Sequence, residues 1–313
     1  MKRLLTAALA IAGALAAAAP ASAETITVTT PLDAPSGLEC SLREAVGAAS
    51  DNSATGHEGC AAGEAGAEDV IVLEAGVVYS LTLTGAGEDS NASGDLDLDT
   101  GSAGAALVAG GPGARPTLDG ALGDRILDVT GDGDLRIEGL RLARGAAPGV
   151  ESTDTAGAVR WTGAAADGVL TLRDALLEDN SAAIAGAIDT ETTGGALIED
   201  STVRDTQTND EGAVRVRGGP ATVRRSAIVD NLGGGLVGQM EGAGAVTIEE
   251  STVARNRFGA DLSVGGVFSA GGTSVENSTV SGNLGGFVGG VHSKGPLQVR
   301  FSTITGNGAP EDV

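Results

Sequence analysis

Aliphatic residues return at a regular spacing along the second half of the chain. In seven aligned segments the third and the eighth positions are always Val, Ile or Leu, and fragments such as VTI and STV alternate apolar with polar residues. This alternation predicts short strands with one buried face. A helical repeat would need apolar residues three and four apart over longer stretches, which frequent Gly, Asn and Asp interrupt. The segments begin at Leu135, Leu170, Ala196, Ala221, Val246, Thr273 and Leu297.

The spacing of these segments is typical of a solenoid. Their starts lie 24 to 35 residues apart, within the range of stacked repeats. After most segments a Gly-Ala or Gly-Gly pair opens a second short strand, as at Gly157 and Gly212. We therefore predict an all-β fold, a single-stranded right-handed parallel β-helix with about 24–27 residues per coil. In this register Ile248 lies directly over Val275.

Two further columns support the same register. The eleventh position is Asn in five of the seven segments, and we expect Asn to adopt left-handed backbone there and to form hydrogen bonds from coil to coil. The fourth position is always charged, and opposite charges face each other at every step except one. Each exposed pair contributes at most about 1 kcal/mol, so the ladder favours a register more than it adds stability. These residues are Glu138, Arg173, Glu199, Arg224, Glu249, Glu276 and Arg300, and the two glutamates 249 and 276 are the exception.

The first 23 residues have the pattern of a secretory signal peptide. Lys2 and Arg3 precede an apolar stretch at 4–19, and the small residues ASA end at Ala23. The stretch is short and alanine-rich for a membrane anchor, and no later stretch reaches the ~20 apolar residues of a membrane span. We expect a secreted protein, extracellular or on the cell surface, with no membrane span after the signal is removed.

Composition and charge narrow the class of protein. The chain has 42 acidic and 19 basic residues and a net charge of −23, which argues against the usual basic type of nucleic-acid binder. Two cysteines and two histidines are too few for zinc fingers or clustered Cys/His metal sites. Because export permits disulfides, we predict a bridge between Cys40 and Cys60.

A short helix is predicted near the N-terminus. An alternating strand at 24–30 precedes it, and Ser41 with Glu44 three residues later forms a capping box. Apolar residues then give one helical face from Leu42 to about Ala49. A β-helix ends in an unpaired apolar coil that natural proteins cover, so we expect this helix to cap the N-terminal end.

The segment CSLREAV at 40–46 resembles the CSLREA domain of exported bacterial proteins. The similarity covers about residues 24–100, including the second cysteine at Cys60 and the strand-like DVIVL at 69–73. The later S-T-[VI]-x-x-N repeats resemble right-handed parallel β-helix proteins of the pectate-lyase-like and polymorphic outer-membrane-protein type. The resemblance implies a secreted or surface protein and no established chemistry. We divide the chain into a signal peptide (1–23), a CSLREA-type capping region with the first coils (24–100) and β-helix repeats (101–313).

Some β-helix proteins of the type that this chain resembles are polysaccharide lyases or hydrolases. The active site of such an enzyme needs paired carboxylates, or acidic metal ligands with an arginine base. Asp189, Arg215 and His292 occupy equivalent places after the second strand of their coils. Asp95, Asp97 and Asp99 alternate along one predicted strand and would present three carboxylates on one face, with calcium as the cation considered. Trp161 is the aromatic residue suggested for stacking on a sugar. No complete catalytic motif accompanies them, so we assign no catalytic residue and no required cofactor.

Three functional hypotheses follow. The first is an exported non-catalytic β-helix that acts as an extracellular interaction or adhesion module for a glycan or a surface protein. The second is a carbohydrate-active lyase or hydrolase, and the third is a structural stalk or spacer. An enzyme needs carboxylates, or carboxylates with Arg or His, that converge within about 5–10 Å. Outward charges paired from coil to coil would favour a binding module.

Overall fold

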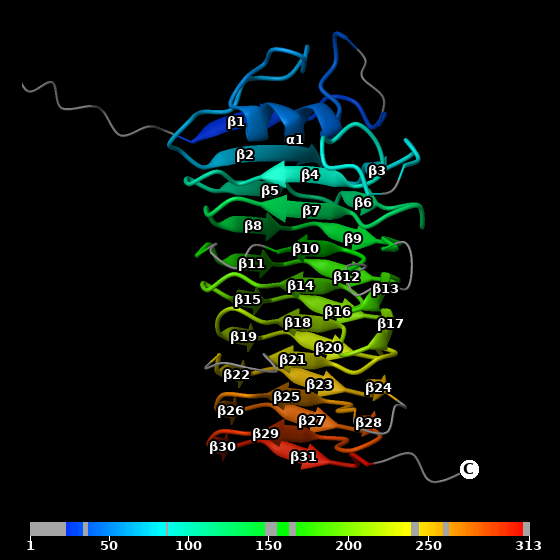
Figure 1. The fold of residues 1–313 in the computed structure, drawn as a ribbon, viewed down its shortest axis with the longest axis vertical. Helices are drawn as coiled ribbons and strands as arrows, with labels where there is room; N and C mark the ends of the chain where they lie inside the picture. The colour runs from blue at the N-terminus through cyan, green and yellow to red at the C-terminus, as the bar shows by residue number, and fades with distance from the viewer. Residues whose placement is uncertain are drawn as a thin grey trace, which may run out of the picture.

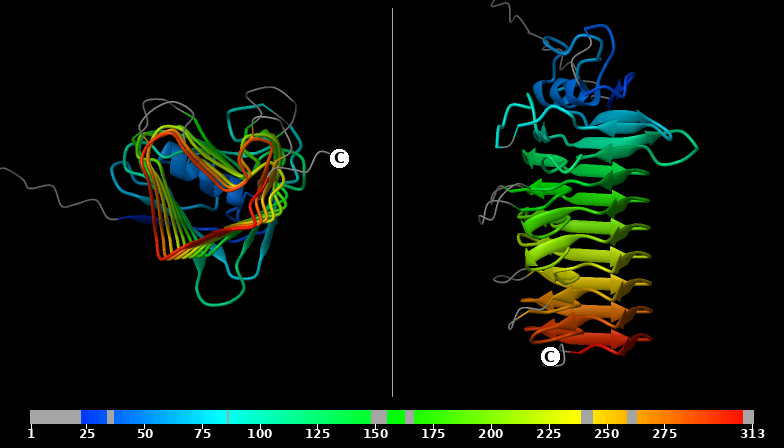
Figure 2. Two further views of the ribbon diagram at one scale, coloured as in Figure 1. Left: turned by 90° about the horizontal axis from the view of Figure 1, so that it is seen from below. Right: turned by 90° about the vertical axis from the view of Figure 1, so that its right-hand side faces the viewer.

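The predicted fold class is confirmed. The computed structural model describes residues 23–33, 37–85, 87–147, 155–162, 167–238, 244–258 and 263–308, so the first 22 residues of the predicted signal lie outside it. The chain winds as a right-handed parallel β-solenoid, with its coils stacked along the long axis (Figures 1 and 2). One short helix, α1 (Leu42–Asp51), accompanies the strands of the described residues. Within these ranges no helix is long and apolar enough to cross a membrane.

Three long parallel sheets form the sides of the solenoid. Sheet A contains β1 (Glu24–Thr27), β2 (Asp69–Glu74), β5 (Ala105–Gly110), β8 (Leu135–Glu138), β11 (Leu170–Arg173), β15 (Ala196–Glu199), β19 (Ala221–Arg224), β22 (Val246–Glu249), β26 (Thr273–Glu276) and β30 (Leu297–Arg300). Sheet B contains β3 (Val78–Ser80), β6 (Thr117–Asp119), β9 (Arg141–Ala143), β12 (Leu176–Glu178), β16 (Thr202–Arg204), β20 (Ala227–Val229), β23 (Thr252–Ala254), β27 (Thr279–Ser281) and β31 (Thr303–Thr305).

Sheet C forms the third side and carries most of the residues discussed below. It contains β4 (Leu96–Asp99), β7 (Leu127–Thr130), β10 (Val159–Trp161), β14 (Ile188–Thr190), β18 (Val214–Val216), β21 (Leu236–Gly238), β25 (Val267–Ser269) and β29 (Val291–Ser293). Two short pairs complete the described strands: β13 (Ser181–Ile184) with β17 (Gln207–Asp210), and β24 (Arg257–Phe258) with β28 (Leu284–Gly285).

The aliphatic columns stack in the predicted register. Ile248 pairs with Val275 between β22 and β26, and Val253 pairs with Val280 between β23 and β27. All four side chains are fully buried, whereas Thr247, the residue before Ile248 on β22, is partly exposed. Burying each such aliphatic side chain contributes about 1.5–3 kcal/mol, and each coil adds to the same continuous core.

The Asn column forms a buried ladder, but the predicted left-handed backbone at Asn is wrong. Asn231 Nδ2 donates to Asn256 Oδ1 (2.8 Å), and Asn256 Nδ2 donates to Asn283 Oδ1 (3.0 Å). The left-handed residue is the one before each Asn, for example Asp230 at φ 58°. Placing the turn residue first directs the amide inward, where it bonds to neighbouring coils and satisfies buried carbonyls.

Helix α1 covers the N-terminal end of the stack, as predicted (Figure 1). Ser41 accepts a hydrogen bond from Glu44 N, and the Glu44 carboxylate accepts one from Ser41 N, so the capping box is complete. The helix ends at Asp51, slightly later than predicted. The predicted Cys40–Cys60 disulfide is confirmed and ties the start of the helix to the loop that follows it.

A buried arginine fastens this cap to the first coils. Arg43 is 4% exposed, and its Nε donates to Asp33 Oδ1 (2.9 Å). Its two Nη atoms donate to the carbonyl oxygens of Gly94 (2.8 Å) and Asp95 (2.6 Å). Because the charge is paired and its remaining donors are satisfied, α1 and the segment that leads into β4 hold each other in place.

Candidate functional site

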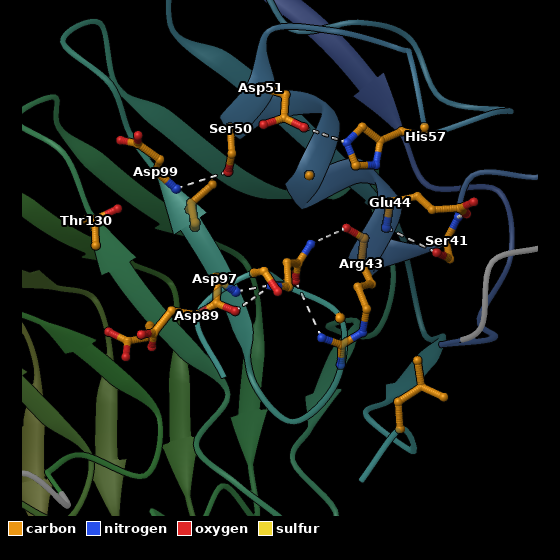
Figure 3. Close-up of a pocket in the computed structure, with 18 of the residues that line it drawn as sticks. Ser41, Arg43, Glu44, Ser50, Asp51, His57, Asp89, Asp97, Asp99 and Thr130 are labelled. Atoms are coloured by element: carbon orange, nitrogen blue, oxygen red, sulfur yellow. Dashed lines mark hydrogen bonds and ion pairs between the residues drawn. The ribbon is translucent and has the colours of Figure 1, made fainter. Parts of the chain in front are cut away.

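A pocket of about 750 Å³ lies where the cap meets the first coils of sheet C. One wall is α1 with the loop that carries His57, and the other is formed by the segment around Asp89 and by β4, β7 and β10. Figure 3 shows His57 and Asp51 on the cap side and Asp89 and Asp97 on the sheet side. The disulfide holds the cap wall together, and Arg43 positions this wall against the segment that leads into β4.

Charged residues of successive sheet C strands lie in register with one another, starting at the pocket. The register pairs Asp97 with Asp128, Asp128 with Arg160, and Arg160 with Asp189. It continues from Asp189 to Arg215 and then through one residue of each later coil. We call this row the C column: Asp97, Asp128, Arg160, Asp189, Arg215, Val237, Phe268 and His292.

Three carboxylates converge at the pocket end of the C column. One oxygen each of Asp89, Asp97 and Asp128 lies within 4.8 Å of the others. Asp97 Oδ2 also accepts a hydrogen bond from Asn91 N (2.7 Å), and Asp128 Oδ2 accepts one from Arg160 Nη1 (2.8 Å). These oxygens could bind hydroxyl or ammonium donors, or part of the oxygen shell of a calcium ion.

Of the predicted trio of carboxylates, only Asp97 belongs to this group. Asp95 is 3% exposed, and its Oδ2 lies 2.8 Å from Arg125 Nε. Asp99 is exposed at the end of β4, where its Oδ1 accepts a hydrogen bond from Gly101 N (2.8 Å). Alternate residues of one strand lie about 6.6 Å apart, whereas adjacent coils are ~4.8 Å apart, so the next coil supplies the closer neighbour.

Burial makes the carboxyl groups of this region hard to ionise. Burial raises the pKa of Asp97 to about 6, although the hydrogen bond from Asn91 N opposes the rise. For Asp95, burial and the nearby Asp124 raise the pKa to about 7 against the opposing charge of Arg125. Of these two groups Asp97 lines the pocket, so the pocket gains negative charge as the pH rises through about 6.

We expect Asp97→Asn to stabilise the protein at pH 7.5 but not at pH 4. In the folded protein Asp97 keeps its proton up to about pH 6, whereas in the unfolded chain it loses the proton near pH 4. The contribution of Asp97 to the free energy of unfolding is therefore fully present below pH 4 and is lost as the pH rises through 6. After allowance for solvent screening, the gain at pH 7.5 should be about 1 kcal/mol. Urea denaturation at both pH values measures the change in the free energy of unfolding, and Asp99→Asn on the same strand is the control. An equal gain at both pH values would contradict the prediction.

Asp189 and Arg215 lie side by side in the C column, as their equivalent sequence positions predicted. Asp189 is fully buried and accepts hydrogen bonds from Arg215 (2.8 and 2.6 Å) and Arg217 (3.1 and 2.9 Å). Although burial opposes ionisation, these hydrogen bonds hold the pKa of Asp189 below its usual value. Arg215 also donates to Glu211 (2.8 Å). Because these groups are hydrogen-bonded to one another, they stabilise the solenoid, and none of them is available as a general acid or base.

His292 lies in the same column but in the last strand of sheet C, far from the pocket. Its ring packs against Phe268, with 5.3 Å between the ring centroids, and against Phe287, at 5.4 Å. Trp161, the aromatic residue suggested for stacking, is fully buried, and its Nε1 donates to Gly131 O (3.3 Å). That suggestion is wrong because Trp161 points inward between the coils.

Sequence reasoning missed Asp89, Asp128 and Arg160. Asp128 follows Asp97 by 31 residues and Arg160 follows Asp128 by 32, both outside the 24–27 residues of the regular coils. Asp89 lies in an irregular segment. The sequence held one signal for Arg160: it lies between two apolar residues in VRW, the alternation typical of a strand with an outward-facing arginine. Comparison with known proteins found no matching family model, no matching curated protein and no matching solved structure. The similarity to the CSLREA domain stays a prediction.

Proposed function

We propose that the protein is an exported, non-catalytic binding module whose pocket beside α1 holds part of an extracellular glycan or surface protein. The observation that carries this proposal is the convergence of Asp89, Asp97 and Asp128 in a pocket walled by the cap. Below the pocket, Asp189 is buried and paired with arginines, so within the C column the carboxylates that a ligand can reach lie at the cap end. The disulfide is consistent with export, because such bonds persist in oxidising compartments.

The lining of the pocket suits a ligand rich in hydrogen-bond donors. Carboxylates outnumber the cations there, and Arg43 is already committed to Asp33 and to backbone carbonyl groups. Hydroxyl groups of a sugar or an ammonium group would pair with the open carboxylate oxygens. Asp89, Asp97 and Asp128 are the residues that would hold a calcium ion, which could bridge the protein to an anionic ligand.

Calorimetric titration of the full chain tests this proposal. The probes are calcium chloride, neutral cello-oligosaccharides and acidic alginate oligosaccharides. We expect at least one probe to bind, and the double variant Asp89→Asn with Asp97→Asn to weaken that binding roughly tenfold or more, because charge-assisted hydrogen bonds are lost. Glu249→Gln, on sheet A away from the pocket, should bind like the wild type. Binding that is unchanged in the double variant, or no binding of any probe, would contradict the proposal.

One observation favours a hydrolase as a second candidate. Three carboxylates lie close together, and one of them, Asp97, has a pKa of about 6 and could donate a proton near neutral pH. Asp128, beside Arg160, would then act as the second carboxylate. Release of reducing sugar from the same oligosaccharides by the wild type, with loss of that release in Asp97→Asn, would favour this candidate over the binding module. A stalk or spacer would need neither pocket nor converging acids.

A further inference from the structure

The last described coil exposes side chains of the kind that the coil before it buries. Leu297, Val299 and Ile304 are 48%, 44% and 41% exposed. The register partners of the last two, Val275 and Val280, are fully buried one coil earlier. The aliphatic core is therefore open to solvent at the end of the stack that lies opposite α1 (Figure 1). We call the exposed side of β29, β30 and β31 the open face.

The open face also carries three free strand edges. Sheet A ends at β30, sheet B at β31 and sheet C at β29, and no further strand of the described residues pairs with them there. From β2 to β26, the first residue of each sheet A strand donates its N–H to the coil that follows, for example Thr273 N to Pro296 O (2.8 Å). Leu297 occupies this position in β30. Its backbone groups, and those of Val299 two residues later, therefore point away from the stack, where another strand can pair with them.

The edge of β30 is complementary to itself. A two-fold axis that passes between the Gln298 residues of two copies makes their β30 strands antiparallel. Leu297 of one copy then lies opposite Val299 of the other, so the two residues with free backbone groups form a hydrogen-bonded pair. Residues opposite each other lie on the same side of the sheet, so these apolar side chains meet on the core side. Arg300 lies opposite Pro296, and no like charges meet within the paired strands.

A second copy of the chain suits the open face better than a peptide does. The same two-fold axis places β31 of one copy over β29 of the other, because sheets B and C follow and precede sheet A in each coil. All three edges then gain a partner, whereas one extended peptide could cover only one of them. The last coil, 291–308, offers 18 residues, close to the 20 or so per partner of a small stable interface. Because α1 covers the other end, stacking cannot continue, and the assembly closes as a dimer.

We infer that two copies of the chain associate through the open face, about a two-fold axis at Gln298, to form a rod with one pocket near each end. This inference goes beyond the proposed function. Seven coil steps separate Asp97, at the pocket, from His292 in β29, a span of about 34 Å. The two pockets of the dimer lie about 70 Å apart, and two linked sites bind a ligand with repeated units more tightly than one.

Cysteine cross-linking tests the predicted axis. In the dimer the Cα atoms of the two Gln298 residues are about 4.5 Å apart, within the range of a disulfide. Cys40 and Cys60 are already bonded to each other, so Gln298→Cys adds the one free thiol. Under mild oxidation at about 100 µM, we expect this variant to form a covalent dimer on a non-reducing gel. Ser274→Cys is the matched control, because Ser274 is the register partner of Gln298 one coil earlier and its two copies lie about 14 Å apart. Equal cross-linking of both variants, or none at position 298, would overturn the inference.

Sedimentation equilibrium of the full chain measures the association without a cross-link. We expect the wild type to be dimeric at about 100 µM, and Val299→Lys to raise the dissociation constant about tenfold or more, because two lysines would enter an apolar face. The 44% exposure of Val299 should leave the single chain folded, which circular dichroism checks, and the cysteine experiment does not depend on this variant. Leu232→Lys, at an apolar residue that is 55% exposed on another coil, should associate like the wild type.

Two other results would show the inference to be wrong. The first is a wild type that stays monomeric, or a dissociation constant that Val299→Lys leaves unchanged. The second is a mass that rises beyond the dimer, which would indicate open-ended stacking. Neither result affects the pocket, whose calorimetric test uses different variants, so failure of the dimer and failure of the proposed function are distinguishable.

Discussion

Asp189→Ala is expected to lower the free energy of unfolding by about 3–5 kcal/mol. Asp189 is fully buried on sheet C, and its carboxylate accepts hydrogen bonds from both Arg215 and Arg217. Arg215 is itself 6% exposed, so removal of the carboxylate leaves a buried guanidinium group with one partner, Glu211. The loss follows from that uncompensated charge. Urea denaturation followed by circular dichroism measures it.

A matched ion pair elsewhere in the solenoid provides the control. Asp230 and Arg255 also join neighbouring coils, with 2.6 Å between Asp230 Oδ2 and Arg255 Nη2, but their side chains are 41% and 58% exposed. We expect Asp230→Ala to cost less than about 1 kcal/mol, because water screens and replaces the interaction. Similar losses for Asp189→Ala and Asp230→Ala would contradict the buried placement of Asp189.

Val253→Asp is the second substitution with a large expected effect, several kcal/mol of lost stability. Val253 is fully buried in β23, between Ile228 of the coil before and Val280 of the coil after. A carboxylate there has no partner, so it must lose its hydration or take up a proton. Thermal and urea denaturation should both report the loss.

The same substitution one residue away provides the matched control. Thr252 lies on the same strand, but its side chain points to the opposite face and is partly exposed. Thr252→Asp should cost less than about 1 kcal/mol, and Glu249→Ala on sheet A less than about 0.5 kcal/mol. If Val253→Asp and Thr252→Asp caused comparable losses, the assignment of inward and outward positions would be wrong.

The regular part of the fold could be predicted because its signal repeats. From Leu170 onward each coil places an aliphatic residue at the same two positions, and stacking identical positions is the simplest way to bury them. The cap was predictable for a different reason, since Ser41 and Glu44 satisfy the free backbone groups at a helix start whatever the tertiary fold. The Asn ladder was predicted as a ladder, but its turn geometry depends on the residue before each Asn, whose identity varies among Asp, Arg and Gly.

The candidate site was harder to predict because it is formed where the repeat is irregular. Asp89 precedes β4 in a segment without strands, and Asp128 and Arg160 follow longer coils, so no alignment column brings them together. The ring of His292 likewise packs against a strand residue, Phe268, and a turn residue, Phe287. Such contacts depend on the path of individual turns, which composition and periodicity do not determine.

Disulfide trapping between adjacent coils tests the central claim, that residues about 25 positions apart stack directly on one another. Thr222, Thr247 and Ser274 are consecutive register partners on the partly exposed face of sheet A. Coils about 4.8 Å apart permit a disulfide between neighbours, whereas two coils span about 9.6 Å, beyond the reach of the bond. In dilute protein under mild oxidation, we expect the cysteine pairs 222/247 and 247/274 to cross-link within the chain and the pair 222/274 to remain reduced. Cross-linking of 222/274, or failure of both adjacent pairs, would contradict the stacked register.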